Sequence, residues 1–340
     1  MTQSPDLRST SCTDRAESRL TCDVDGATLA PVMSKPGAVA AGFVLASAAF
    51  GASASTPNTV RTAPLSEPLL RLPARPADAI GGSEFARRTS GLSAADRDRA
   101  VVAELERGNI PSFLGHLTPV KLATHSPDGP TVGATIWVTP DYLAIGSDDD
   151  FLYVPLTYYS ATIIADRFGS VLPTARMVDA IYEQAAHHLT PAPLPAGPLM
   201  CSNLYLEKHQ QRIDEQRSGL PLGELISGHK KDLVLTNRLR QVPGRVAIYG
   251  WHRAPGAPIQ PLSTVHGAQY VDYSHGVRLV STTVVVDGRP RSIYDALQDS
   301  HVAPVLSREG VTRDPWGLMH PRVSGPGPAP AAPVLVARPE

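Results

Sequence analysis

The sequence has few cysteines and no excess of charge of either sign. The cysteines are Cys12, Cys22 and Cys201. The first two precede an apparent export signal, so a chain that loses this region keeps Cys201 alone and forms no intramolecular disulfide. A formal net charge of −1 over 340 residues excludes a general electrostatic argument for nucleic acid or an anionic membrane as partner. The exported protein must therefore depend on its hydrophobic core for stability.

Two catalytic motifs are also absent. There is no G-x-S-x-G elbow, which disfavours the α/β-hydrolase architecture. There is no H-E-x-x-H and no pair of metal-spaced cysteines, so we predict no cofactor. Zinc is the alternative, because His229 and Asp232 with His252 or His275 would supply the three protein ligands that a catalytic zinc needs.

The segment that begins at Met33 has the three-part plan of a secretory signal peptide. Lys35 is followed by an apolar run over about 37–50, and Ala52-Ser53-Ala54 supplies an A-x-A cleavage signal. The run is too short for a hydrocarbon core of ~30 Å, which needs roughly 20 residues. We therefore predict a leader over 1–54, a true start at Met33, a secreted or periplasmic location and no membrane span after cleavage. The alternative is a buried Ala-rich helix.

Proline-rich segments flank the part of the chain that should fold. Residues 55–80 are predicted to be a linker, and residues 316–340 a disordered Pro/Ala-rich tail. The body between them, 81–315, has no internal repeat and is predicted to be a single domain.

Helical patterns come early in this body and strand patterns late. Helices are expected after Ser93, around 160–168, after Pro173 and over 204–219. Strands are expected over 131–147, 151–157, 231–237, 244–252 and 276–290, with a hairpin turn at Asp287-Gly288. Without regular βαβ alternation this order favours an α+β fold with a mostly antiparallel sheet in the C-terminal half.

Polar residues gather in three segments of the C-terminal half. Four histidines lie at strand ends or beside glycines, where scaffolds present side chains to ligands, and histidine is suited to proton transfer near pH 7. The predicted catalytic residues are His229, Asp232, His252, Asp272, Tyr273, Ser274, His275 and Arg278. The predicted substrate-binding residues are Lys231, Trp251, His266 and Tyr270.

The stretch 270–280, YVDYSHGVRLV, carries the densest set of these groups and has the pattern of one strand. Strand alternation would place Asp272 and Ser274 on one face and Tyr273 and His275 on the other. A nucleophilic Ser274 would then need a base from another segment, such as His252 or His229. The alternative for Ser274 is a structural hydrogen bond.

The segment VAIYGWH…SHGVRL resembles the catalytic stretch of YkuD-type L,D-transpeptidases, in which a histidine precedes a Ser-x-Gly-Cys-x-Arg motif. His252 would correspond to that histidine, and Ser274, Gly276 and Arg278 to parts of the motif. Only Val277 stands between Gly276 and Arg278, so the nucleophilic cysteine is missing and the resemblance carries over no thiol mechanism.

The body as a whole is similar to uncharacterised exported bacterial proteins. The similarity rests on GNIPSFL, TPDYLAIGSDDD, GHKKD, IYGWH and DYSHG. It implies one coherent domain and nothing about chemistry.

Three functions fit this pattern. The first is an exported hydrolase that uses histidine acid–base chemistry on an extracytoplasmic polymer or conjugate, of the cell-wall peptide or glycan class. In it His252 and His275 share proton transfer, Tyr273 and Arg278 stabilise negative charge, and Lys231 holds a substrate anion. The second is a polysaccharide lyase, in which Tyr273 or His275 abstracts a proton and Arg278 or Lys231 neutralises a uronate carboxylate. The third is a secreted carbohydrate- or peptide-binding module without catalysis.

Overall fold

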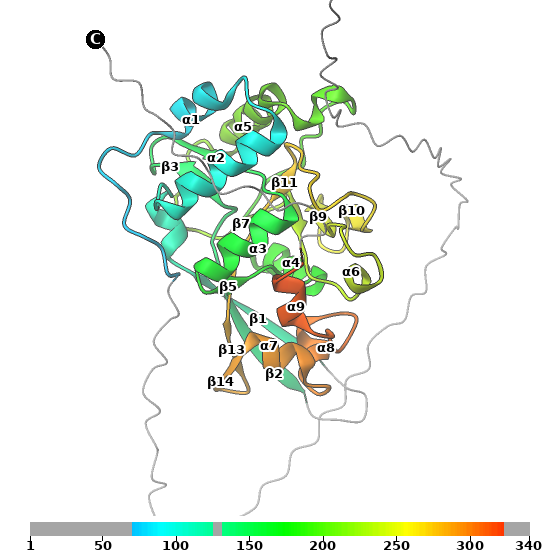
Figure 1. The fold of residues 1–340 in the computed structure, drawn as a ribbon. Helices are drawn as coiled ribbons and strands as arrows, with labels where there is room; N and C mark the ends of the chain where they lie inside the picture. The colour runs from blue at the N-terminus through cyan, green and yellow to red at the C-terminus, as the bar shows by residue number, and fades with distance from the viewer. Residues whose placement is uncertain (1–69, 125–130, 323–340) are drawn as a thin grey trace, which may run out of the picture. The chain divides into compact units, whose positions relative to one another are not determined.

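The computed structural model describes residues 70–124 and 131–322 (Figure 1). These residues all belong to one compact unit of the chain. The predicted leader, most of the linker and the tail from residue 323 lie outside the described residues. The folded part extends beyond the expected domain limits of 81 and 315. Leu70 is part of the hydrophobic core, and a helix covers Pro315–Met319.

The described part is an α+β fold. The helices of eight or more residues all precede residue 218, and most strands follow it. The long helices are α1 (Gly82–Thr89), α2 (Ala94–Glu106), α3 (Tyr158–Arg167), α4 (Ala175–Gln184) and α5 (Asn203–Arg217). The short helices are η1 (Ser112–Gly115), η2 (Pro198–Cys201), α6 (Arg238–Gln241), α7 (Ile293–Gln298), α8 (Ala303–Leu306) and α9 (Pro315–Met319).

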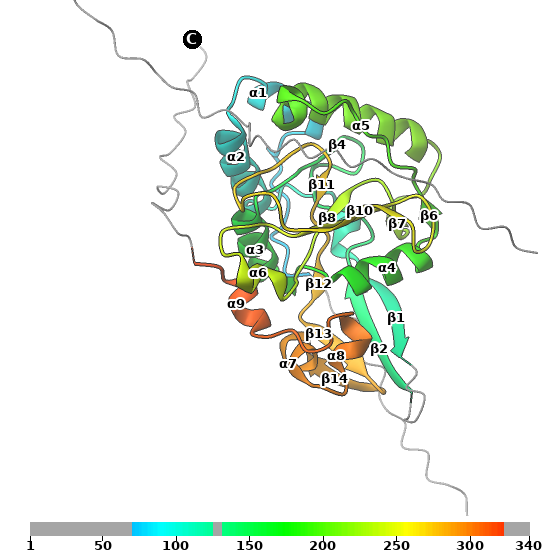
Figure 2. The ribbon, with the colours of Figure 1, turned by 90° about the vertical axis from the view of Figure 1, so that its right-hand side faces the viewer.

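The larger sheet has six strands, in the order β14-β13-β2-β12-β5, with β1 paired to β2. All its pairs are antiparallel. Its strands are β1 (Thr118–Thr124), β2 (Val132–Val138), β5 (Ser170–Val171), β12 (Val280–Ser281), β13 (Thr283–Val286) and β14 (Arg289–Ser292). The orange helices α7 and α8 pack beside it (Figures 1 and 2).

The predicted hairpin is confirmed in this sheet. β13 and β14 pair from Val286↔Arg289 to Thr283↔Ser292, which leaves Asp287 and Gly288 as a two-residue turn. Their φ angles of 46° and 78° are those of a turn with both central residues left-handed, a conformation that Asp-Gly tolerates well.

The second sheet has four strands, in the order β10-β9-β8-β11. β8 pairs with β9 antiparallel and with β11 parallel, and β9 pairs with β10 antiparallel. Its strands are β8 (Lys231–Leu233), β9 (Ile248–His252), β10 (Pro258–Ser263) and β11 (His275–Gly276). Two small pairs complete the strands: β3 (Ala144–Gly146) with β4 (Phe151–Tyr153), and β6 (His187–His188) with β7 (Ile226–Ser227).

Local signals fixed the helix starts. The Ser93 hydroxyl accepts the Asp96 N–H at 3.1 Å, as expected for an N-cap, and α2 ends beside Gly108 at φ 84°. α4 starts after the Thr174 cap and buries Met177, Val178 and Ile181 in the core. α4 contacts β1, β7 and β9, so it packs between the two larger sheets.

The expectation of one strand over 270–280 is wrong. Tyr273 and Ser274 form a turn, and strand pairing is limited to His275–Gly276 and to Val280 at the end of the stretch. The cause is Asp272, whose carboxylate accepts the N–H of Ser274 two residues on, at 2.7 Å. Such an Asx turn competes with strand pairing, so the predicted alternation of faces does not apply.

Cys201 is disulfide-bonded. The expectation of a lone thiol concerned only a chain without its leader.

Within residues 70–124 and 131–322, no helix has the length and apolar character needed to cross a membrane.

Candidate functional site

The four-stranded sheet brings three of the predicted segments side by side. Lys231 on β8 pairs with His275 on β11, and β9 with Trp251 flanks β8 on the other edge. The pairing needs a glycine at 276, because a Cβ there would lie 2.6 Å from the Tyr142 ring and 2.7 Å from the Lys230 side chain. Segments distant in sequence therefore present side chains to one place.

We call the resulting group the Asp272 cluster. It comprises Lys231, Trp251, His266, Tyr270, Asp272, Ser274 and His275. It unites seven of the twelve predicted site residues.

The carboxylate of Asp272 is the centre of this cluster. Its Oδ1 accepts the N–H of Ser274 at 2.7 Å and the Ser274 hydroxyl at 2.5 Å. Its Oδ2 accepts the Tyr270 hydroxyl at 3.3 Å and lies 3.8 Å from His275 Nε2. Burial alone would raise the pKa of Asp272, but His275, Lys231 and the bonds from Ser274 lower it on balance. The carboxylate is therefore held in its charged form.

His275 is fully buried beside this carboxylate. Burial lowers its pKa to about 4, although Asp272 acts in the opposite direction, so the imidazole is neutral at pH 7. Neither ring nitrogen has a hydrogen-bond partner among the described residues. Buried polar atoms nearly always pair, so an imidazole without hydrogen bonds at both nitrogens is an exception that calls for a functional explanation.

The outer part of the cluster is only half-buried. Lys231 places its ammonium 5.0 Å from the centre of the Trp251 ring. His266 stacks on Tyr270 with ring centroids 4.2 Å apart, and Tyr270 meets His275 edge-on at 5.8 Å. Lys231, His266 and Tyr270 therefore form the side of the cluster nearest to solvent.

His229 lies in a different group. Its Nε2 is 3.2 Å from Asp141 Oδ1, and the rings of Tyr142 and Tyr153 enclose it. Arg217 donates to the other oxygen of Asp141 at 2.6 Å. Burial would raise the pKa of Asp141, but His229, Arg217 and Arg278 together lower it to about 2. This is a buried ion-pair network and no part of the Asp272 cluster.

Asp232 and Arg278 adjoin that network. Tyr142 donates its hydroxyl to Asp232 at 2.8 Å, and burial raises the pKa of Asp232 to about 6. Arg278 donates to the carbonyls of Thr139 and Ile226 at 2.7 and 2.6 Å and has no exposed surface. Arg278 therefore anchors backbone, and its Nη1 and Nη2 donors are already used by these two carbonyls.

His252 is placed with a third carboxylate. Its Nε2 is 3.0 Å from Asp179 Oδ1, which also accepts the Tyr249 hydroxyl at 2.8 Å. Tyr182 stacks on the imidazole at 4.7 Å. His229, His252 and His275, all predicted to be catalytic, therefore each lie beside a different aspartate.

Tyr273 points away from Asp272. Its hydroxyl accepts the Leu194 N–H at 2.7 Å, and its ring packs with Leu194 and Trp251 in a small apolar cluster. The turn at Tyr273 and Ser274 sends the two side chains in different directions.

Two buried polar residues near the cluster were not predicted. Lys230 donates its ammonium to the Tyr273 carbonyl at 2.8 Å, and burial lowers its pKa to about 7. His209 has no exposed surface, and neither ring nitrogen has a hydrogen-bond partner within the described range. Helical spacing would have found it, because Leu206, His209 and Ile213 lie on one face of α5.

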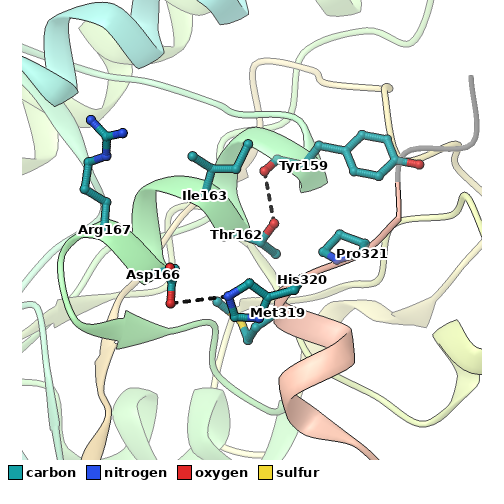
Figure 3. A pocket seen from close by; sticks show the side chains of 8 residues that line it. All are labelled: Tyr159, Thr162, Ile163, Asp166, Arg167, Met319, His320 and Pro321. Carbon is teal, nitrogen blue, oxygen red and sulfur yellow. Dashed lines mark hydrogen bonds and ion pairs between the residues drawn. The ribbon is translucent and has the colours of Figure 1, made fainter. Parts of the chain in front are cut away.

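Two hollows on the surface of the described residues lie away from the Asp272 cluster. One of about 390 Å³ is formed by α3 and α9, where Figure 3 shows Asp166 paired with His320. Another, of about 400 Å³, is acidic and lies between α1 and α5. Neither includes a predicted site residue.

No group of three or more His, Cys, Asp or Glu side chains in the described ranges is arranged to hold a metal ion. No protein-family model, curated protein or solved structure matches the chain.

Proposed function

We propose that the protein is an exported hydrolase whose catalytic centre is the Asp272 cluster, with His275 as general base and acid. The observation that carries this proposal is the imidazole of His275, neutral, buried, open at both nitrogens and adjacent to a charged carboxylate. A base must be unprotonated at the working pH and within reach of the proton that it removes.

The cluster contains the groups that acyl hydrolysis needs. His275 would take a proton from water as the water oxygen bonds to the substrate carbonyl carbon, and the carbonyl π electrons move to oxygen. Lys231 and Tyr270 would stabilise that oxyanion by charge and hydrogen bonding. When the bond to the leaving group breaks, His275 returns the proton to it. Asp272 would stabilise the imidazolium formed in between.

Ser274 has a positioning role in this scheme. Its hydroxyl proton is directed at Asp272 Oδ1 at 2.5 Å, and no base contacts its oxygen in the described part of the chain. The serine therefore orients the carboxylate, and water is the nucleophile.

The proposed substrate is an extracytoplasmic polymer or conjugate, of the cell-wall peptide or glycan class. The support is the half-buried outer side, where a lysine and the stacked pair His266–Tyr270 offer a positive charge beside two aromatic rings. Such a combination suits a ligand that has both an anionic group and an apolar or sugar face.

Two residues that the lyase alternative requires are engaged in other hydrogen bonds. It used Tyr273 and Arg278, but the first bonds to Leu194 and the second to two backbone carbonyls. The binding module differs from the hydrolase only in turnover.

The test is a screen of the full chain against peptidoglycan fragments and uronate polymers, with His275→Gln and His301→Gln compared. His301 is an exposed histidine and serves as the matched control. We expect His275→Gln to lower turnover by roughly 10²–10⁴-fold and His301→Gln to leave it unchanged. Equal turnover in both variants, or products with a new ultraviolet-absorbing double bond, would contradict the proposal.

A further inference from the structure

We propose a second ligand site, for the carboxylate of a small molecule, in a hollow of about 140 Å³ on the outer side of α4. It is separate from the Asp272 cluster and independent of the hydrolase proposal. The hollow is lined by Lys121, Leu122 and Ala123 of β1, Arg176, Asp179, Ala180 and Glu183 of α4, and Arg308.

Helix periodicity produces the polar wall. Arg176, Asp179 and Glu183 recur at a spacing of three and four residues, so they share one face of α4. The buried Met177, Val178 and Ile181 occupy the other face. One short helix thus anchors itself in the core and presents charged groups to the hollow.

Arg176 is held in place before any ligand binds. Its Nε donates to the Val305 carbonyl at 2.6 Å and its Nη2 to the Ala123 carbonyl at 2.7 Å. Neutral carbonyls leave its positive charge uncompensated, and no hydrogen bond within the described residues uses Nη1. A guanidinium fixed in this way loses little entropy when it binds a carboxylate.

The second arginine of the hollow, Arg308, already forms an ion pair within the protein. Arg308 lies 2.7 Å from Asp179 Oδ2, while Asp179 Oδ1 is used by Tyr249 and His252. Asp179 is therefore satisfied and does not neutralise Arg176.

The remaining charges fit a monoanion. The hollow has three cations and two carboxylates, an excess of one positive charge. A single carboxylate balances this excess, whereas a phosphate dianion would exceed it and would face Glu183. A volume of about 140 Å³ equals the liquid share of roughly four to five waters, which suits a ligand of a few heavy atoms.

The experiment is a titration of the full chain with acetate, and separately with inorganic phosphate, at constant ionic strength set by chloride. Calorimetry and the NMR signal of the His252 Cε1–H, which lies behind Asp179, report binding. We expect saturable acetate binding that is stronger than phosphate binding. Lys121→Gln should weaken it about tenfold and Glu183→Gln should strengthen it, since both side chains are exposed and alter only the charge of the hollow. Arg289→Gln, at an exposed position on β14, is the control.

Two results would overturn the assignment. One is the absence of a saturable response to acetate, or tighter binding of phosphate. The other is equal acetate affinity in wild type, Lys121→Gln and Glu183→Gln. Because neither test variant removes a described hydrogen bond of its own side chain, loss of folding does not obscure the outcome.

Discussion

Lys231 and His275 lie opposite each other in the parallel pair of β8 and β11, and the Lys231 N–H donates to the Ser274 carbonyl at 2.8 Å. This pairing fixes a cation beside a neutral imidazole and the charged Asp272. The pairing belongs to the backbone, so the relative position of the two side chains does not depend on a flexible surface contact.

His252 should be far less important for turnover than His275. The two imidazoles face different carboxylates, Asp179 and Asp272, and no contact within the described residues joins them. We expect His252→Gln to keep turnover within about threefold of wild type, against a loss of roughly 10²–10⁴-fold for His275→Gln. Steady-state kinetics on any substrate found will measure both, and an equal loss would show that the histidines act together.

Acid should destabilise the fold through His275. Its pKa falls from 6.5 in the unfolded chain to about 4 in the fold because of burial, so between these values the unfolded state binds the extra proton. The free energy of unfolding therefore decreases as pH falls through this window, and the contribution is complete above about pH 6.5.

Asp232 acts in the opposite sense, because burial raises its pKa from 3.8 to about 6. Its stabilising contribution is present at low pH and is lost as pH rises through that range. Relative to wild type, urea denaturation at several pH values between about 4 and 7 should show an unfolding free energy that rises less, or falls more, with increasing pH for His275→Gln, and one that rises more for Asp232→Asn. Identical slopes would refute the assigned shifts.

Asp272→Asn should lower stability by about 2–4 kcal/mol, because an amide cannot replace a buried carboxylate that accepts three hydrogen bonds and faces His275. Asp149→Asn is the matched control, since Asp149 is exposed. Chemical denaturation measures the difference. A cost below about 1 kcal/mol for Asp272→Asn would mean that the turn does not depend on its charge.

The buried pair of Arg217 and Asp141 should matter far more for folding than the exposed pairs of α1. Arg217→Met leaves Asp141 buried without its guanidinium partner and should cost about 3–5 kcal/mol. Arg87→Met removes an exposed partner of Glu84 and should leave the unfolding transition unchanged. Thermal denaturation of both variants compares them directly, and similar midpoints would argue against the network.

Features set by neighbouring residues could be predicted from the sequence. The Ser93 cap, the ends of α2 and α5 near glycines, and the Asp287-Gly288 hairpin all depend on side chains within a few positions of each other. The α+β class could be predicted from the order of these local patterns along the chain, with helices early and strands late.

The partners of the histidines could not be predicted in this way. Asp141 and Asp179 meet His229 and His252 across many intervening residues, so only tertiary pairing reveals them. The turn at Asp272 was not predicted, because the residues around it have a pattern typical of a strand. In the structure the hydrogen bond from the Ser274 N–H to the Asp272 carboxylate forms an Asx turn instead of strand pairing. His209 was not predicted; it is buried on the same face of α5 as Leu206 and Ile213, so its position on the helix decides its surroundings.

The parallel pairing of β11 with β8 also has a kinetic consequence. It joins segments about forty residues apart, with the β9–β10 hairpin between them, and closing a loop of that size costs chain entropy before any contact offsets it. During refolding, helical signals should therefore return before turnover does, because turnover needs this non-local strand pair.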